Sequence, residues 1–115
     1  FGAVNSPLAQ PRNMVGGHFL SALVGVGSGM LLPDVLWLAA CFAVATAIAV
    51  MHLSKTLHPL GGATALIAVT GGESIRQLGW WYAFVPCLAG ALILLAVALV
   101  FNNIPRNRRW PLFWW

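Results

Sequence analysis

Three long apolar runs determine what this chain can fold into. They cover residues 13–32, 35–54 and 80–101, and each is close to the length of about 20 residues that a helix needs to cross a bilayer. Charged residues make up only 7% of the chain, whereas a soluble domain carries roughly 25%. Backbone groups inside lipid must pair within the protein, which favours helices. We therefore predict an all-α, polytopic membrane bundle that forms one domain over residues 1–115, with the lipid bilayer as its main solvent.

A fourth apolar stretch, residues 59–70, is too short to be a fourth full span. It begins with His58-Pro59 and is followed by Gly71-Gly72. Proline is favoured at the first position of a helix, and glycine just beyond the last. We predict a short broken or half-helix with His58 as its N-cap. The N-terminus of such a helix carries unpaired N–H groups and a partial positive charge, which can hold an anion inside a membrane.

Proline, glycine and polar residues separate these segments. Residues 1–12 are predicted to be a loop, because prolines interrupt it. Asn13 and Asp34 stand before the first two long runs, where they can act as N-caps. Pro86 is expected to kink the helix over 80–101 near its start. The tail, residues 102–115, is basic and aromatic, so we expect it to lie along the lipid headgroups.

Small residues recur at a spacing of four along the long runs. This spacing places them on one helix face, where they allow another helix to approach closely. We expect these faces to pack against copies of the chain, in a homo-oligomer, or against other subunits of a larger membrane complex. The residues concerned are Gly17, Ser21, Gly25, Gly29, Ala39, Ala43 and Ala47.

The charges indicate how the chain threads the membrane. If residues 59–70 return to the side they left, the six Lys and Arg residues divide three against three. If they cross, Lys55 lies on the same side as Arg12 and the three arginines of the tail, so that five of the six positive charges share one side. The positive-inside bias favours crossing, with Lys55 and the tail cytoplasmic in a prokaryotic inner membrane. The net charge of +4 is too small and scattered for a nucleic-acid partner.

The candidate anion site is built around the start of the half-helix. His58 can line it, the glycines allow the backbone to approach a ligand, and Thr64 offers a hydroxyl. Arg12 can supply a fixed positive charge. In the alternative reading, His58 is a structural cap that satisfies a buried carbonyl, and Arg12 only sets topology. The candidate residues are His58, Pro59, Gly61, Gly62, Thr64, His18 and Arg12.

Other chemistries find little support in the sequence. A lone intramembrane histidine such as His52 can ligate haem iron or chlorophyll magnesium, or can hydrogen-bond a neighbouring helix. The histidines lack the companions and spacing of a metal site, and no nucleophile–base pair suggests an enzyme. We expect Cys41 and Cys87 to be small buried hydrophobes. The prediction is a non-enzymatic protein without a metal or cofactor.

Several separated motifs resemble those of the HPP family of small integral membrane proteins. They are residues 6–13 (SPLAQPRN), 16–18 (GGH), Met51, 58–66 (HPLGGATAL) and Asn102-Asn103. The family's His-Pro-Pro reads His58-Pro59-Leu60 here. Family members usually have a further hydrophobic helix before the first motif, so an N-terminal helix is expected to be missing before Phe1.

The resemblance implies membrane transport, because some plant and cyanobacterial members are described as nitrite transporters. We therefore expect transport or channel-like passage of a small anion, with nitrite as a candidate. The alternative is a non-catalytic accessory or structural subunit of a larger membrane complex, in contact with a haem or a chlorophyll-type pigment.

Overall fold

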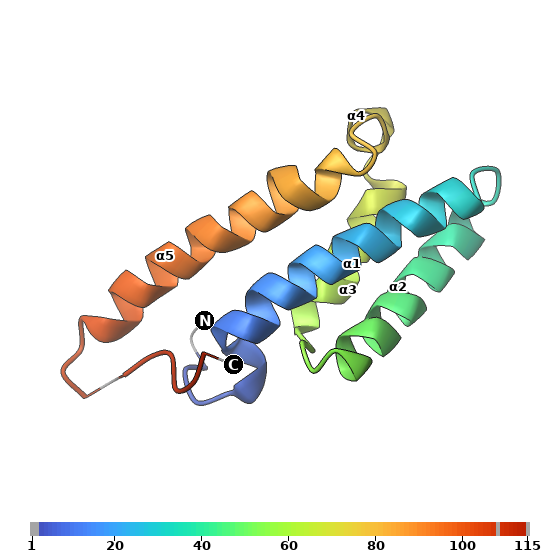
Figure 1. Ribbon diagram of the computed structural model, residues 1–115. Helices are drawn as coiled ribbons and strands as arrows, with labels where there is room; N and C mark the ends of the chain where they lie inside the picture. Colours follow the sequence, from blue (N-terminus) through green and yellow to red (C-terminus); the bar gives the residue numbers. More distant parts are fainter. Residues whose placement is uncertain (1–2, 108, 115) are drawn as a thin grey trace.

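The computed structural model describes residues 3–107 and 109–114 as a bundle of helices (Figure 1). No strand occurs among these residues and 73% of the chain is helical, which confirms the all-α fold. The elements in chain order are η1 (Pro7–Ala9), α1 (Pro11–Leu31), α2 (Leu36–Leu53), α3 (Pro59–Thr70), α4 (Glu73–Arg76), η2 (Ala83–Leu88) and α5 (Ala89–Asn103).

Helix α1 is the centre of the bundle, since it contacts α2, α3, η2 and α5. Helix α2 returns beside it, α3 again runs in the direction of α1, and α5 comes back along its other side (Figure 1). The chain therefore leaves α3 at the end opposite to the one where it entered. The bounds of α3 are the predicted 59–70. Three segments, α1, α2 and η2–α5, are long and apolar enough to span a membrane.

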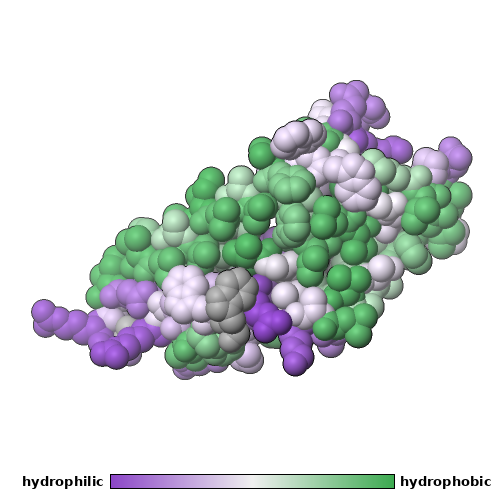
Figure 2. Space-filling view, viewed as in Figure 1, coloured by the Kyte–Doolittle hydropathy of each residue, from purple (hydrophilic) through white to green (hydrophobic). Residues whose placement is uncertain are grey.

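The outer surface fits a lipid environment. Figure 2 shows hydrophobic side chains along the length of the bundle and hydrophilic ones gathered mainly towards its ends. Helices α2 and α5 present large apolar side chains outward, among them Trp37 at 70% and Phe101 at 66% exposure. In water these exposed side chains would form patches that monomeric soluble proteins rarely carry.

The small-residue faces pack inside the chain. A Cβ atom added at Gly25 would lie 2.6 Å from the carbonyl oxygen of Ala65 on α3. Ala39, Ala43 and Ala47 of α2 form a buried cluster with Ala65 and other residues of α3. The prediction that these faces serve copies or other subunits is therefore wrong. The chain's own short helix occupies the place expected for a partner.

Two predicted N-caps are also wrong. Helix α1 begins at Pro11 with Gln10 as its N-cap, two residues before the expected start. Proline lacks an N–H and suits the first helical position, so Asn13 already lies in the first turn. Helix α2 begins after Val35, and Asp34 remains in the preceding turn without capping it.

The predicted third long helix is kinked near its start, as expected from Pro86. Within η2 (Ala83–Leu88), Val85 has the dihedral angles of an extended residue (φ −135°, ψ 109°). The cause is Pro86, because a proline ring disfavours the helical conformation of the residue before it. Helix α5 then continues to Asn103, two residues beyond the predicted end.

Two segments expected to be irregular contain further structure. Residues 7–9 of the predicted N-terminal loop form a 3-10 turn, capped by the Ser6 hydroxyl. The tail folds back towards the start of α1 and buries Trp110 to 2% exposure. The expectation that the whole tail lies along the headgroups is therefore wrong for Trp110, which packs inside the protein.

The contact between α1 and α3 leads to a stability prediction. Gly25→Ala should lower the free energy of unfolding by about 1–3 kcal/mol, because the added methyl would overlap the α3 backbone. Gly90→Ala is the matched control, since a Cβ at Gly90 would meet nothing within 4 Å. Equal stability of the two variants in denaturant titrations of the detergent-solubilised protein would contradict this packing.

Candidate functional site

Helices α1 and α3 bring two imidazole rings together. The ring centroids of His18 and His58 lie 5.0 Å apart, with the ring planes inclined at 59°. Gly17 makes this possible, because a Cβ atom there would lie 2.6 Å from the Cβ of His58. The two histidines are 40 residues apart in the sequence, so their pairing depends on the α1–α3 contact.

His58 is held from the N-terminal loop. Its Nδ1 lies 3.0 Å from the carbonyl oxygen of Leu8. A carbonyl can only accept, so Nδ1 carries a proton and donates it. This bond supports the structural alternative raised from the sequence, in which the imidazole satisfies a carbonyl. The other ring nitrogen, Nε2, is buried and has no hydrogen-bond partner in the described part of the chain.

His18 is oriented by the α3 residue Thr64. The Thr64 hydroxyl donates to the carbonyl of Leu60 at 3.2 Å, and it lies 2.7 Å from Nδ1 of His18. Either Thr64 or His18 can be the donor in this bond, according to the tautomer of His18. The bond to Leu8 places the proton of neutral His58 on Nδ1, so its Nε2 presents a lone pair.

A second buried polar atom lies at the same helix crossing. The side chain of Ser21 is fully buried, and its hydroxyl has no hydrogen-bond partner among the described residues. A Cβ atom at Gly61 would lie 2.7 Å from this oxygen, and it would also overlap the sulfur of Met51. The sequence analysis gave Ser21 only a packing role, although it is the one hydroxyl in the stripe of small residues.

The side chain of Arg12 binds the C-terminal end of α2 and not the histidine pair. Its Nη2 donates to the carbonyl of Ser54, beyond the last turn of α2, at 2.9 Å. Asn13 donates in the same way to the carbonyl of Leu57 at 2.8 Å. A cation at a helix C-terminus is favourable both as a donor and towards the helix dipole. This placement supports a structural role for Arg12.

The remaining candidates lie around the start of α3. Pro59 occupies its first position and is exposed. Gly62 faces α2, where a Cβ would lie 3.7 Å from Val44. The N–H of Gly61 donates to the carbonyl of His58 at 2.9 Å. The structure thus gathers His18, His58, Thr64 and Gly61, and it places Arg12, Pro59 and Gly62 outside this cluster.

Two other candidates from the sequence lie on the outside. His52 is exposed, and its Nδ1 lies 3.1 Å from the carbonyl of Ile48 one turn earlier. Cys87 is half-buried, but Cys41 is exposed. The expectation of burial is therefore wrong for Cys41, whose side chain faces outward from α2. Within the described residues, no three His, Cys, Asp or Glu side chains gather as metal ligands would.

The bundle, with three spanning segments and an apolar outer surface, is that of an integral membrane protein. The chain belongs to the HPP family: the transmembrane region of that family matches residues 1–111. The resemblance inferred from the motifs is therefore confirmed.

Two relatives come from Dictyostelium discoideum, and both are described simply as transmembrane proteins. One is 50% identical over 118 residues, which cover all of this chain and 41% of the relative. The other is 48% identical over 118 residues, covering all of this chain and 38% of the relative. The chain thus spans about two fifths of the length of these proteins. No solved structure matches it.

The bond between His58 and Leu8 leads to a second prediction. His58→Ala should cost about 1–2 kcal/mol of unfolding free energy, because the Leu8 carbonyl loses its donor in a poorly hydrated site. His58→Asn should cost clearly less, since the Asn amide nitrogen takes the place of Nδ1. Thermal unfolding in mild detergent tests this order, and equal losses for both variants would argue against the bond.

Proposed function

We propose that this chain passes a small monovalent anion across the membrane, with nitrite as the candidate substrate, and that the His18–His58 pair binds the anion. The observation that carries the proposal is the buried, unpartnered Nε2 of His58 at the start of α3. Ionisable groups within membrane segments are costly, and they commonly mark ion or substrate pathways. The family resemblance supports the same function.

The tautomers suggest how binding works. A neutral ring with its proton on Nδ1 offers only a lone pair at Nε2, which repels an anion. Protonation turns Nε2 of His58 into a donor and adds a positive charge. The hydroxyl of Ser21, which lies close to Gly61 in the first turn of α3, and the positive end of the α3 dipole also favour an anion. The anion and a proton therefore bind together.

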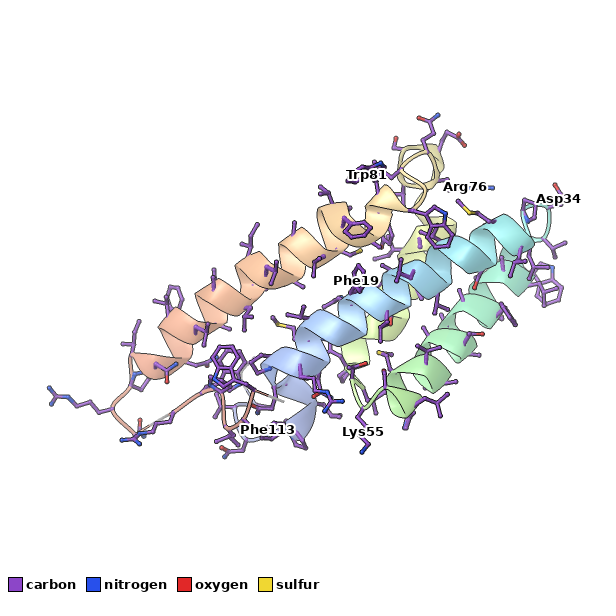
Figure 3. All side chains as sticks on the ribbon, in the orientation of Figure 1. Phe19, Asp34, Lys55, Arg76, Trp81 and Phe113 are labelled. Carbon is purple, nitrogen blue, oxygen red and sulfur yellow. The ribbon has the colours of Figure 1, made fainter. Side chains whose placement is uncertain are left out.

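The surroundings support this coupling. The described groups that face His58 are the Leu8 carbonyl of η1, with Gly17 and His18 of α1. The only two acids of the chain lie in the Asp34 turn and at the start of α4, at the opposite end of the bundle (Figure 3). Over residues 3–107 and 109–114, no carboxylate balances an imidazolium at this site, so the bound anion supplies the counter-charge.

Assembly and orientation are parts of the proposal. Leu60, Leu66 and Ile67 on the outer face of α3 are 39–55% exposed, and the tight α1–α3 contact leaves little room for a path between these two helices. A pathway along the outer face of α3, completed by a second copy, fits both observations. The positive-inside bias places the Lys55 end in the cytoplasm. The location in a prokaryotic inner membrane remains a prediction from the sequence.

Uptake of nitrite into proteoliposomes tests the site. His58→Asn keeps the bond to Leu8 and removes the ring, so it should reduce uptake by about tenfold or more, the value of one hydrogen bond to a charged group. Ser21→Ala should reduce uptake in the same direction. His52→Gln is the matched control and should transport normally. Normal uptake by His58→Asn would remove the site assignment. A wild-type protein without uptake would favour the accessory-subunit alternative.

The coupling predicts a pH dependence. At a fixed nitrite concentration, the initial rate of uptake should rise as the external pH falls to about 5, because burial lowers the pKa of the His58 imidazole below its ordinary value. Passive entry of nitrous acid is measured with protein-free liposomes and subtracted. The His58→Asn protein should show no rise above this background. A protein-dependent rate that does not change with pH would refute the coupling.

A further inference from the structure

A hollow lies between the two ends of the chain. It has a volume of about 650 Å³ and is lined by residues 3–5 of the N-terminal loop and by Arg106, Asn107, Arg109 and Leu112 of the tail. Small-molecule sites commonly have volumes of about 300–1,000 Å³. The tail folds back beside the start of α1 in Figure 1, where Leu112 donates its N–H to the Gln10 side chain. The hollow is separate from the histidine pair and does not depend on its proposed role.

Buried hydrogen bonds hold the walls of this hollow in place. Gln10 is fully buried, and its Nε2 donates to the carbonyls of Val4 (3.1 Å) and Ser6 (2.9 Å). The Gln10 side-chain oxygen accepts the N–H of Leu112 at 2.9 Å. One amide side chain therefore joins the loop to the tail. The hollow is a built feature of the fold.

A second pair of hydrogen bonds fixes the tail to the end of α5. Asn103, at the end of α5, accepts the N–H of Trp110 at 3.0 Å and donates to the Trp110 carbonyl at 2.6 Å. Arg106 and Arg109 lie in the turn between these two residues. The turn holds both arginines beside the N-terminal loop, at the end of a membrane-spanning segment.

The two arginines have no counter-charge among the residues that the structure describes. Among the described residues, no hydrogen bond or ion pair occupies either guanidinium, and both are exposed. The two acids of the chain lie at the other end of the bundle. The hollow is therefore positively charged and open to an anion.

We propose that this hollow binds a phosphate group, as carried by the headgroup of an anionic phospholipid. Guanidinium groups match phosphate oxygens in geometry and bind them with two parallel hydrogen bonds. Basic pockets beside the ends of membrane helices are suited to such headgroups. The apolar surface of α5, with Val100 and Phe101 exposed close to its end, offers the acyl chains a place to lie.

The test is retention of lipid by the full-length protein in mild detergent, read by native mass spectrometry. Wild-type protein should retain phosphatidylglycerol at least about tenfold better than phosphatidylcholine, from roughly 1 kcal/mol per arginine near a headgroup. The double variant R106Q/R109Q should lose this preference. Both side chains are exposed, so the fold should be unchanged by circular dichroism. Arg76→Gln, at the opposite end of the bundle, is the matched control and should behave as wild type.

Two further measurements complete the test. The first distinguishes a specific site from a general effect of positive charge, and the second distinguishes a lipid headgroup from free phosphate. Gln10→Leu removes the bridge between loop and tail without changing the charge, and it should also weaken the lipid preference. Inorganic phosphate that displaces phosphatidylglycerol or raises the melting temperature of wild type, but not of R106Q/R109Q, would identify free phosphate as a source. Wild-type retention in R106Q/R109Q, or an equal loss in Arg76→Gln, would overturn the proposal.

Discussion

The close approach of α1 and α3 is the constraint on which the rest of the structure depends. It requires the absence of side chains at Gly17, Gly25 and Gly61, where a Cβ would overlap atoms of the facing segment. Lipid is as apolar as the side chains themselves, so helix association in a membrane relies on such close packing. The same contact sets His18 beside His58. Without this contact the two imidazole rings would not lie next to each other.

A second constraint is the pairing of backbone carbonyls where the helices stop. An unpaired carbonyl costs several kcal/mol in a bilayer, and the breaks before α1 and before α3 expose several. The side chains of His58, Arg12 and Asn13 donate to the carbonyls of Leu8, Ser54 and Leu57. Polar residues that look like ligands in the sequence thus first serve the backbone. The atoms left over, His58 Nε2 and Ser21 Oγ, are the ones available for chemistry.

The two functional proposals rest on different groups. The histidine pair lies in the contact between α1 and α3, and in the proposed function its charge changes when it binds an anion. The arginines of the tail lie in an open hollow, where their side chains are exposed. The first arrangement suits a ligand that comes and goes with a proton. The second suits a phosphate group that stays.

Much of the architecture could be predicted from the sequence. The bounds of α3 follow from Pro59 at its start and Gly71 at its end, because both signals act on the local backbone. Local rules failed where two of them competed. Asn13 is a good N-cap, but Pro11 before it had already started the helix. The kink expected at Pro86 is present, because the proline restricts the preceding residue, Val85, to an extended conformation.

The sequence by itself determined an all-helical membrane bundle, its three spans and its short fourth helix. These features depend on composition, periodicity and the effect of proline and glycine on neighbouring residues. Only the tertiary structure decided that the small-residue faces pack on α3, that Gln10 joins the tail to the loop, and which histidine nitrogen is unpartnered. Those outcomes depend on groups as far apart as Gln10 and Leu112. Spacing along the chain carries no information about such distant partners.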